Sequence, residues 1–566
     1  MKLIYISKQE VDSWNVPKIF FKSCFAIFLT IIFLFSGSNL NAQAVGAVYA
    51  MTNGEGQVDG IVQGPNAVVA YAQAEDGTLT QIGTFSTGGL GGDYDGGEGL
   101  DPLISAYAIT KTLNNRFVLA VNAGSNTVTA MQVNEDFSLT VTDTETTIDI
   151  GPNSIAFNPV EADGLQGMVY VSNITRAEFL DLGEPGHQGS LVGYWLTDGG
   201  DLVPIENSAR NLANRPSAVQ FSPDGSWLVA ASINAGAAGL GSGNEDEIVV
   251  YSVNADGTLS AEQTDGTTST LRGNAEGRNL PSAIGFQIVD DNIVVVTEAR
   301  EFQPDGAPPA FPALQDGSVS TWRIEADGTF TPIDLDVASG ENNTGRTACW
   351  LDFSDPNTFF VSNAIEAGLA SYSFNDGDIE LLNQVAAQGT GATGNTTDPA
   401  AAFGTTEGWI DLWISDDGQF LYQSYGLTGE VGVYAIDGAE LTLIQEIGGL
   451  PQNNVQGIVS VGQPTTGTTS VFDITSCDCN FNIAPNPIND FASFTYELRE
   501  SGQVNLRIVD ILGRPIANEL VGEQQSAGEH TVTWNVTTGN LPTGNYFAIL
   551  TVNNRIETLK FVVQGK

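Results

Sequence analysis

The chain has 566 residues and carries 67 acidic against 20 basic side chains, for a formal net charge of −47. A surface this acidic repels nucleic acid and anionic lipid, so we expect neither a nucleic-acid partner nor a basic binding groove. The length exceeds that of one ordinary domain, which predicts more than one folded part.

The first 42 residues are typical of an export signal. Lys18 and Lys22 precede an apolar run over Cys24–Phe35, and a polar stretch follows to Ala42. The run is too short to span a bilayer and lies where a signal peptide belongs, so residues 1–42 are predicted to be a signal peptide. No later segment is apolar enough for a transmembrane helix, which predicts none in the mature chain.

Residues 43–463 repeat one pattern seven times: a strand of alternating character runs into an acidic turn that usually contains glycine. Each repeat has a large residue at a fixed place, namely Tyr71, Met131, Tyr194, Tyr251, Trp322, Tyr372 and Tyr434. The turn, mostly Asp-Gly, lies where a hairpin must reverse. A spacing of roughly 50 to 70 residues fits one four-stranded sheet with its loops. Such a sheet cannot bury both faces alone and must stack on a neighbour, so seven repeats predict a seven-bladed β-propeller.

Two further strands precede most of these anchor strands. The clearest inner strands are 152–159, 216–225, 281–288, 348–355 and 409–418, and the second strands are 117–122, 168–173, 227–233, 292–298, 359–363 and 420–425. The first repeat opens on a second strand, 47–53, with no inner strand before it. Its missing partner is predicted at Asn454–Val461, so that strands from both ends of the propeller close the ring.

The remainder of the chain lacks this repeat. Residues 464–481 are rich in Thr and Gly and predict a linker, whereas residues 482–566 again alternate apolar and polar positions between turn signals. Five strands are predicted there, at 491–498, 504–511, 530–536, 546–552 and 557–563. The fold class is therefore all-β, a seven-bladed β-propeller followed by a small β-sandwich.

The repeats serve as an internal control for function, because a residue that recurs in most blades is architectural. Asparagine closes the second strand in four blades, at Asn53, Asn122, Asn173 and Asn363. Blade five departs from this pattern, with Glu298 in that place and Arg300 two residues later. A Glu and an Arg at a loop mouth can position a water and polarise a carbonyl, or can pair with each other.

Cations and acids near the starts of inner strands are the other candidates. Arg215, Arg278 and Arg346 precede inner strands, and guanidinium groups at a channel mouth would bind a carboxylate or phosphate; pairing with nearby acids is the alternative. Asp411 alternates with Ile410 and Leu412 and can face the channel. His187, in a long loop, can act as a general base or be a solvated loop histidine.

The propeller resembles the lactonase-like seven-bladed family, which includes 6-phosphogluconolactonase and carboxy-cis,cis-muconate cyclase. The segments that carry the likeness are Pro216–Ser232, Asn122–Val133 and Gly345–Phe353, with the turn Thr87-Gly88-Gly89 typical of an uncharacterised branch. Members of this family use His with Arg and Glu near the channel. The matching positions here are Asn153, Ser154 and Ser217, so Asn153 becomes a substrate-binding candidate in place of a histidine.

The tail resembles the C-terminal sorting domain of the type IX secretion system of Bacteroidetes. The motifs are Ala484–Pro487, Asp510–Arg514, Leu541–Tyr546 and the terminal Lys566. The resemblance implies that the type IX machinery is a partner and that the protein reaches the cell surface or the extracellular space.

Metal chemistry has little support in the sequence. With only His187 and His530 in the chain, a zinc site or a Ser-His-Asp triad is not expected, and we predict no metal and no cofactor. Calcium stays open at Gly88–Asp101, a glycine-rich loop with four acidic residues whose spacing does not fit an EF-hand.

Two functions follow from these features. One is a lactonase-type hydrolase that opens a small, sugar-derived lactone, with Glu298, Asp411 and His187 as catalytic candidates. Arg215, Arg346, Arg300 and Asn153 would then bind the substrate. The other is a non-catalytic surface propeller that binds a glycan, peptide or protein at the same mouth.

Overall fold

The computed structural model describes residues 44–564, except for 55–56, 59–60, 93–100, 161–165, 176–188, 213–214, 234–246, 261–282, 290–291, 300–316, 341–346, 365–367, 390–406, 453, 464–478, 480, 489–490, 499–500, 511–514, 536–543 and 553–554. Every regular element of the described part is a β-strand. The predicted signal peptide lies outside this part, as do His187, Arg300, Arg346 and nearly all of the predicted linker.

The described residues between 46 and 462 form seven antiparallel sheets, here called blades 1 to 7 in chain order. Blade 1 contains β1 (Gly46–Met51), β2 (Gln57–Val58), β3 (Ile61–Gln73), β4 (Leu79–Gly92) and β29 (Ile458–Gly462). Blade 2 contains β5 (Ile109–Lys111), β6 (Phe117–Asn122), β7 (Thr127–Val133) and β8 (Leu139–Thr146). Blade 3 contains β9 (Ile150–Pro159), β10 (Gly167–Thr175), β11 (Ser190–Leu196), β12 (Leu202–Pro204) and β13 (Arg210–Asn211).

The later blades follow the same order. Blade 4 contains β14 (Arg215–Phe221), β15 (Trp227–Ile233) and β16 (Glu247–Ser252). Blade 5 contains β17 (Ala283–Val289), β18 (Ile293–Glu298), β19 (Ser318–Ile324) and β20 (Phe330–Ala338). Blade 6 contains β21 (Ala348–Asp355), β22 (Thr358–Asn363), β23 (Gly368–Asn375) and β24 (Asp378–Gln388). Blade 7 contains β25 (Trp409–Ile414), β26 (Phe420–Tyr425), β27 (Glu430–Asp437) and β28 (Glu440–Gly448).

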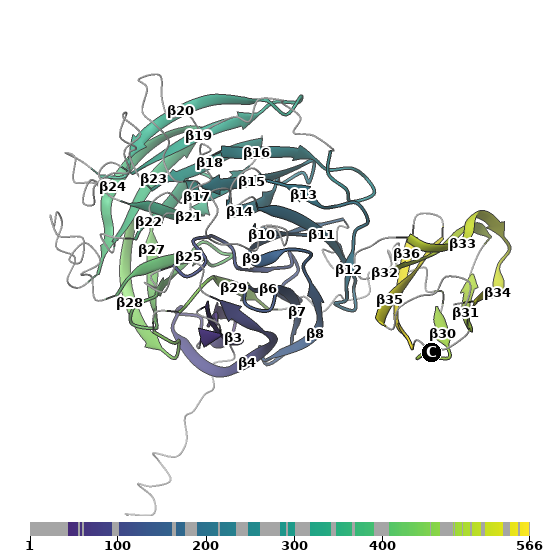
Figure 1. Cartoon of the computed structure of the whole chain (residues 1–566). Helices are drawn as coiled ribbons and strands as arrows, with labels where there is room; N and C mark the ends of the chain where they lie inside the picture. The colour runs from purple at the N-terminus through teal and green to yellow at the C-terminus, as the bar shows by residue number, and fades with distance from the viewer. Residues whose placement is uncertain are drawn as a thin grey trace, which may run out of the picture. The chain divides into compact units, whose positions relative to one another are not determined.

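The sheets close into a ring. The inner strands contact one another in the order β29, β5, β9, β14, β17, β21 and β25, and β25 contacts β29 again. Figure 1 shows several of these strands nearest the centre and outer strands such as β20, β24 and β28 at the rim. Blade 1 joins both ends of the propeller, because β1 pairs antiparallel with β29 and Tyr49 lies opposite Val459. The predicted propeller class and its closing strand are confirmed.

The repeated anchor residues all lie on third strands, as the repeat predicted. The acidic turns that follow require a left-handed residue: Gly77 has a φ of 82° and Gly257 one of 80°. Phe137 takes this position in blade 2 at a φ of 61°, although it is not glycine. Its side chain is buried and its carbonyl accepts a 2.9 Å hydrogen bond from the Tyr49 hydroxyl, so a contact between neighbouring blades supports the strained turn.

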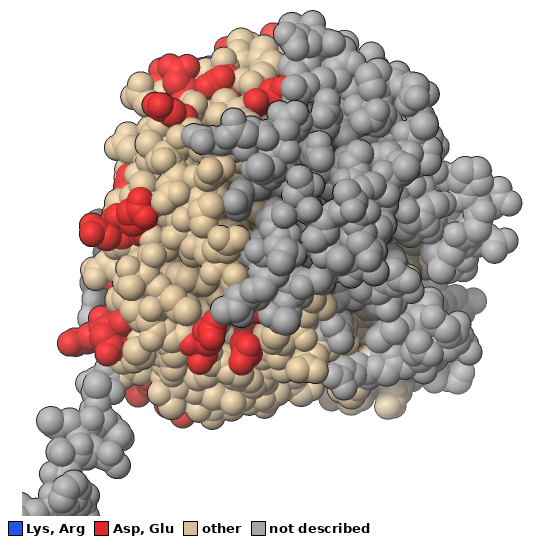
Figure 2. Space-filling view, turned by 90° about the vertical axis from the view of Figure 1, so that its left-hand side faces the viewer, with Lys and Arg blue, Asp and Glu red and all other residues tan. Residues whose placement is uncertain are grey.

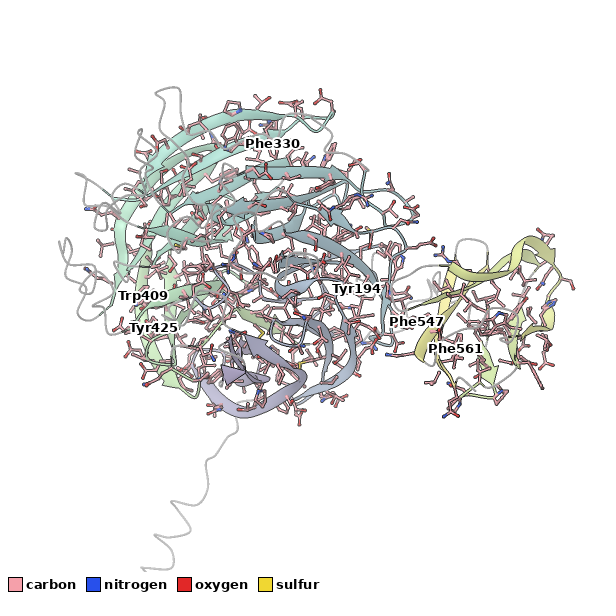
Figure 3. All side chains as sticks on the ribbon, viewed as in Figure 1. Tyr194, Phe330, Trp409, Tyr425, Phe547 and Phe561 are labelled. Carbon is pink, nitrogen blue, oxygen red and sulfur yellow. The ribbon has the colours of Figure 1, made fainter. Side chains whose placement is uncertain are left out.

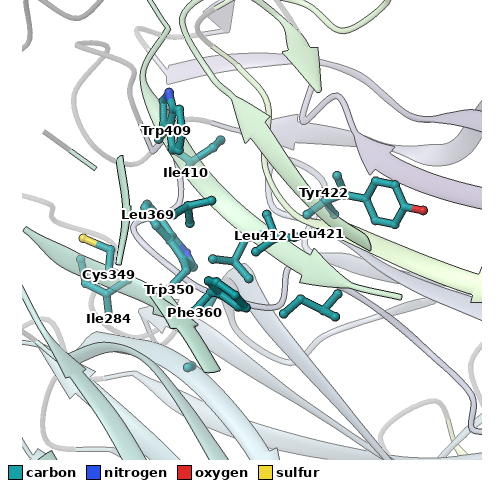
Figure 4. Close-up of a cluster of buried hydrophobic side chains, with 14 of the residues drawn as sticks. Ile284, Cys349, Trp350, Phe360, Leu369, Trp409, Ile410, Leu412, Leu421 and Tyr422 are labelled. Carbon is teal, nitrogen blue, oxygen red and sulfur yellow. The ribbon is translucent and has the colours of Figure 1, made fainter. Parts of the chain in front are cut away.

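Apolar side chains fill the spaces between blades. A large cluster lies around blades 4 to 7 and blade 1, and Figure 4 shows Trp350, Phe360 and Leu412 within it. Trp350 and Leu412 come from the inner strands of adjacent blades, which therefore bury their apolar faces against each other. The propeller depends on this stacking because an isolated sheet leaves one face in water.

The side chain of Asn122 makes four hydrogen bonds, two to blade 1 and two within blade 2. Its Oδ1 accepts from Thr87 Oγ1 at 2.6 Å and from Asn66 Nδ2 at 3.0 Å. Its Nδ2 donates to Thr129 Oγ1 at 2.9 Å and to Thr127 Oγ1 at 3.1 Å. The predicted turn Thr87-Gly88-Gly89 is part of strand β4, and its Thr87 helps to hold the buried amide of Asn122 in place, which is an architectural role.

We expect Asn122→Ala to lower the free energy of unfolding by about 2–4 kcal/mol, because it leaves several buried polar groups without their hydrogen-bond partner. Urea denaturation of the purified protein measures this. Asn254→Ala is the control, since the Asn254 amide bonds only Thr258 in an exposed hairpin and its loss should cost less than about 1 kcal/mol. Equal losses in the two variants would contradict an architectural role for Asn122.

The C-terminal part consists of two sheets. One contains β30 (Asn482–Ala484), β31 (Phe491–Leu498) and β34 (Gly528–Asn535). The other contains β33 (Pro515–Gln525), β32 (Gly502–Asp510), β35 (Gly544–Val552) and β36 (Arg555–Val563). One apolar core that includes Phe494, Trp534 and Phe561 draws on both sheets, which makes this part a β-sandwich. All five predicted strands are present, and β30 and β33 were not predicted.

Acidic side chains are spread over the propeller surface. Figure 2 shows several separate groups of Asp and Glu on the described part of one face. Many belong to the hairpin turns, where the acid accepts hydrogen bonds from a residue two positions later. Asp76 accepts from the backbone N–H and the hydroxyl of Thr78, and these bonds lower the pKa of its carboxyl. Part of the negative charge therefore comes from aspartates that stabilise the hairpin turns.

Candidate functional site

The candidate residues gather at one end of the blades. The start of an inner strand and the end of the antiparallel second strand lie side by side, so Arg215, which begins β14, and Glu298, which ends β18, share that end with Asp411 near the start of β25. We call it the loop-bearing end. His187, Arg300 and Arg346 lie outside the described residues; in the sequence they come between β10 and β11, between β18 and β19, and just before β21.

Polar side chains on the inner strands, or just before them, form hydrogen bonds between neighbouring blades. Ser105 Oγ donates to the carbonyl of Asn153 at 2.8 Å, and Asn153 Nδ2 donates to the carbonyl of Pro216 at 2.7 Å. Ser217 Oγ then donates to the carbonyl of Ala283 at 2.6 Å. Such bonds join blades 2, 3, 4 and 5 in sequence. Asn153 is therefore part of the scaffold, and its Oδ1 also accepts from Ser172 Oγ at 2.8 Å.

Two buried aspartates continue this series. Asp352 accepts from Gln287 Nε2 at 2.7 Å and from the backbone N–H of Ile414 at 2.7 Å, so it bridges blades 5, 6 and 7. Asp411 Oδ2 accepts from the backbone N–H of Gly457 at 2.8 Å and from Gln456 Nε2 at 3.1 Å, which ties blade 7 to the closing segment. Burial raises the pKa of Asp352 to about 6 and that of Asp411 to about 7, despite these hydrogen bonds.

Arg215 and Asp411 are linked across the centre of the ring. Arg215 Nη2 donates to the carbonyl of Leu103 at 2.8 Å, and the Leu103 N–H donates to Gln456 Oε1 at 3.2 Å. Gln456 in turn donates to Asp411. Arg215 and Asp411 are each 4% exposed, so the structure places these two candidates in one buried hydrogen-bond network rather than on a solvent-exposed surface.

Glu298 is held within its own blade. Its carboxylate accepts from the hydroxyl of Ser318, and its Oε1 accepts from Ser320 Oγ at 3.0 Å. Ser318 lies directly opposite Glu298, just as Thr127 lies opposite Asn122 in blade 2. The glutamate thus makes the same kind of strand-to-strand bond as the asparagine that it replaces. Its catalytic role stays a prediction, as do the roles of the other candidates.

A second group of aromatic and acidic side chains lies in blade 7. Trp409, labelled in Figure 3, stacks on Tyr425 with ring centroids 5.2 Å apart and donates from Nε1 to Glu407 Oε2 at 2.8 Å. The hydroxyls of Tyr425 and Tyr434 lie 2.6 Å apart. These contacts explain why Trp409 is completely buried, and they support the inner strand that carries Asp411.

We expect Asp411→Asn to flatten the pH dependence of stability. Because burial raises the folded-state pKa of Asp411 from its ordinary value of 3.8 to about 7, its stability contribution is complete below pH 4 and is lost as the pH rises to about 7. Asparagine cannot ionise and still offers an oxygen to Gly457. Relative to wild type, the variant should gain roughly 2–4 kcal/mol in free energy of unfolding between pH 4 and pH 8.

Urea denaturation at a series of pH values checks this expectation. Asp327→Asn provides the control, because Asp327 lies in an exposed hairpin and hydrogen bonds from Thr329 lower its pKa. It should show no comparable gain as the pH rises. Parallel wild-type and Asp411→Asn profiles would show that Asp411 ionises normally in the folded protein.

Sequence reasoning missed Gln456, Ser105, Asp352 and the buried Glu247. Gln456 lies in the predicted closing strand Asn454–Val461 and Ser105 in a segment without a predicted strand, but neither is a charged or catalytic residue type, so nothing local marked them. Asp352 interrupts the apolar strand Ala348–Phe353 and could have been noticed beside Asp411. Glu247 could have been found by comparing the first residues of the third strands across the blades.

The described residues contain no group of three or more His, Cys, Asp or Glu side chains that could hold a metal ion. The predicted calcium loop lies mostly outside them, and Asp101, at its end, accepts a 3.4 Å hydrogen bond from the Ser105 N–H. No helix in the described part of the chain is long and apolar enough to cross a membrane.

Comparison with protein families shows what the C-terminal part is. Residues 482–564 match the model of the secretion system C-terminal sorting domain. This part is a type IX sorting domain. The protein is accordingly exported, to the cell surface or the extracellular space, and the secretion machinery handles it. No curated protein matches the chain.

The propeller is similar in fold to several solved structures. A Bacteroides fragilis protein provisionally named a 6-phosphogluconolactonase is 15% identical, covers 75% of this chain and 99% of its own, and gives a TM-score of 0.46. A periplasmic gluconolactonase from Pseudomonas aeruginosa is 16% identical, with coverages of 75% and 98% and a TM-score of 0.39. A hypothetical selenium-binding protein from Sulfolobus tokodaii is 12% identical, with coverages of 74% and 92% and a TM-score of 0.46. The activities named belong to those proteins.

Proposed function

We propose that this exported propeller binds a surface glycan or another polar ligand at its loop-bearing end without transforming it. One observation carries the proposal: all four candidates are hydrogen-bonded within the ring. Arg215, Asn153 and Asp411 bond to other segments of it, and Glu298 bonds to the neighbouring strand of its own blade. A catalytic acid or base must reach the proton that it transfers, and these groups already serve the scaffold. The type IX sorting domain is consistent with a role outside the cell.

Hydrolysis of a small lactone is the second candidate, and Asp411 is the observation that favours it. Its carboxyl has a pKa of about 7, close to the value that suits a general base at neutral pH. In this case Asp411 would take a proton from the attacking water. Arg215, whose guanidinium belongs to the same network, would stabilise the negative charge that develops on the carbonyl oxygen.

A paired assay distinguishes the two candidates. Purified full-length protein is applied to a glycan array and is incubated with a panel of lactones at neutral pH. Saturable glycan binding without lactone turnover is the expected result. Turnover that falls about 100-fold or more in a folded Asp411→Asn variant would instead establish the hydrolase.

A variant at Asn153 separates binding from folding. Asn153→Asp keeps one carbonyl-like oxygen for Ser172 but loses the donor to Pro216. It should lower stability, whereas ligand affinity at temperatures well below unfolding stays at the wild-type value.

A further inference from the structure

The first residue of the third strand is a glutamate in blades 4 and 7, and only the one in blade 4 is buried. This residue lies opposite the end of the second strand, where it is Thr127 in blade 2, Ser190 in blade 3, Ser318 in blade 5 and Gly368 in blade 6. In blade 4 it is Glu247, opposite Ser232. Blade 4 thus has a buried carboxylate where blades 2, 3 and 5 have a hydroxyl.

In blades 2, 3 and 5 this position closes a hydrogen bond between the two strands. Thr127 accepts from Asn122, Ser190 from Asn173, and Ser318 donates to Glu298. Blade 4 differs, because within the described part of the chain neither Glu247 Oε1 nor Ser232 Oγ has a hydrogen-bond partner. Glu247 is 4% exposed and Ser232 is fully buried. Two buried oxygen atoms are therefore left unsatisfied side by side.

Both side chains enter the interface between blades 3 and 4. On the strands of blade 4, Ala230 and Val249 belong to the apolar cluster that also contains Tyr170 and Leu191 of blade 3. Successive side chains alternate between the two faces of a sheet, so Ser232, two residues after Ala230, faces the same way. Glu247, two residues before Val249, does so too. The pair lies at the loop-bearing end of this apolar interface.

Among the described residues, no positive charge is recorded acting on this carboxyl. Burial raises the pKa of Glu247 to about 7, and no charged group contributes to the shift. On the same strand, burial raises the pKa of Tyr251 to about 12; Arg210 lowers it and Glu247 raises it. Arg210 itself donates to the carbonyls of Asn207, Ala209 and Ser260. An ionised Glu247 is thus an uncompensated buried charge.

We propose that Glu247 and Ser232 form a binding site for a monovalent cation, either the ammonium group of a small amine or an alkali-metal ion. A single carboxylate balances a single positive charge. Calcium is usually held by several carboxylates, and this pair supplies only one. An ammonium group donates hydrogen bonds to both unsatisfied oxygens. The strongly acidic chain also raises the local concentration of cations. The site is separate from the ring-centre network and does not depend on whether the protein hydrolyses lactones.

Thermal unfolding of the full-length protein tests the site. The melting temperature is measured at pH 8 and constant ionic strength in tetramethylammonium chloride, which is bulky and donates no hydrogen bond. Part of this salt is then replaced by methylammonium, potassium, sodium or calcium chloride. Methylammonium or an alkali-metal ion should raise the melting temperature by about 2 °C or more, because binding only to the folded state stabilises it. The ion that raises the melting temperature shows whether the site binds an ammonium group or an alkali-metal ion.

Protons compete for the same carboxylate, so the rise should disappear at pH 5. Glu247→Gln should abolish the rise at pH 8 and should melt above wild type in tetramethylammonium chloride, since it removes an uncompensated charge. Ser232→Ala, which keeps the carboxylate, should need a higher cation concentration for the same rise. Glu430→Gln is the matched control, because Glu430 holds the same repeat position in blade 7 but is partly exposed, and it should respond as wild type does.

Three results would overturn the proposal. They are the lack of a rise with every monovalent cation, a rise of equal size at pH 5 and pH 8, and an equal rise in Glu247→Gln. If Glu247→Gln does not fold, the pH comparison in wild type and the response of Ser232→Ala still decide the matter. A rise with calcium alone that persists in Glu247→Gln would indicate a different site.

Discussion

Deletion of residues 482–566 will leave the propeller in the periplasm. These residues hold the sorting domain that the secretion machinery handles, and the propeller has its own closed ring and core, so it should fold without them. Cell fractionation and surface protease treatment of the truncated and full-length proteins measure the effect. We expect surface and extracellular protein to fall to the level of a periplasmic marker.

A point variant controls for damage to the sorting domain that is unrelated to recognition. Phe491 is 59% exposed at the start of β31, so Phe491→Ser should leave the sandwich folded and export intact. Truncated protein that still reaches the surface in wild-type amounts would show that export does not require this domain.

Replacement of Ile458, Val459 and Val461 by serine will destabilise the whole propeller. These side chains of β29 are almost completely buried, and the strand supplies the missing inner partner of β1. At roughly 2 kcal/mol for each buried aliphatic side chain, the loss is on the order of 6 kcal/mol. This is comparable to the entire stability of many domains, so the ring should open under mild conditions.

Urea denaturation followed by tryptophan fluorescence measures this effect. The matched control changes Leu382, Leu443 and Ile444 to serine, three aliphatic residues of outer strands that are 48%, 47% and 37% exposed. That triple variant should lose far less stability. If both variants unfold at the same urea concentration, closure by β29 is not what holds the ring.

Local pattern was enough to locate most strands. The predicted second strands 117–122, 227–233 and 420–425 coincide with β6, β15 and β26, because apolar alternation and a flanking turn define a strand within a few residues. The inner strand of blade 2 was not predicted, since β5 has only three residues and too little alternation to detect. β33 was not predicted either, because its sequence PIANELVGEQQ is largely polar.

The candidate site was predicted only in part. The internal comparison of blades correctly marked Asn122 as architectural, since its four hydrogen bonds hold neighbouring strands and blades together. The same comparison singled out Glu298 and overlooked Glu247. Ser318 and Ser320 satisfy Glu298, and this distinction depends on which side chains lie opposite across the sheet. Sequence spacing alone does not contain that information.

The sequence by itself determined the class of fold, the position of the closing strand and the sorting domain. Each of these depends on short-range features of the sequence, namely alternation, Asp-Gly turns and ordered motifs. Such features can be recognised without knowledge of the tertiary contacts. Only the tertiary structure decided what the buried polar groups do. Asp411 accepts a hydrogen bond from Gly457, Arg215 donates one to Leu103, and Glu247 Oε1 has no hydrogen-bond partner among the described residues. The reason is physical: the protonation and bonding of a buried group depend on burial and partners from distant blades, which ring closure alone brings together.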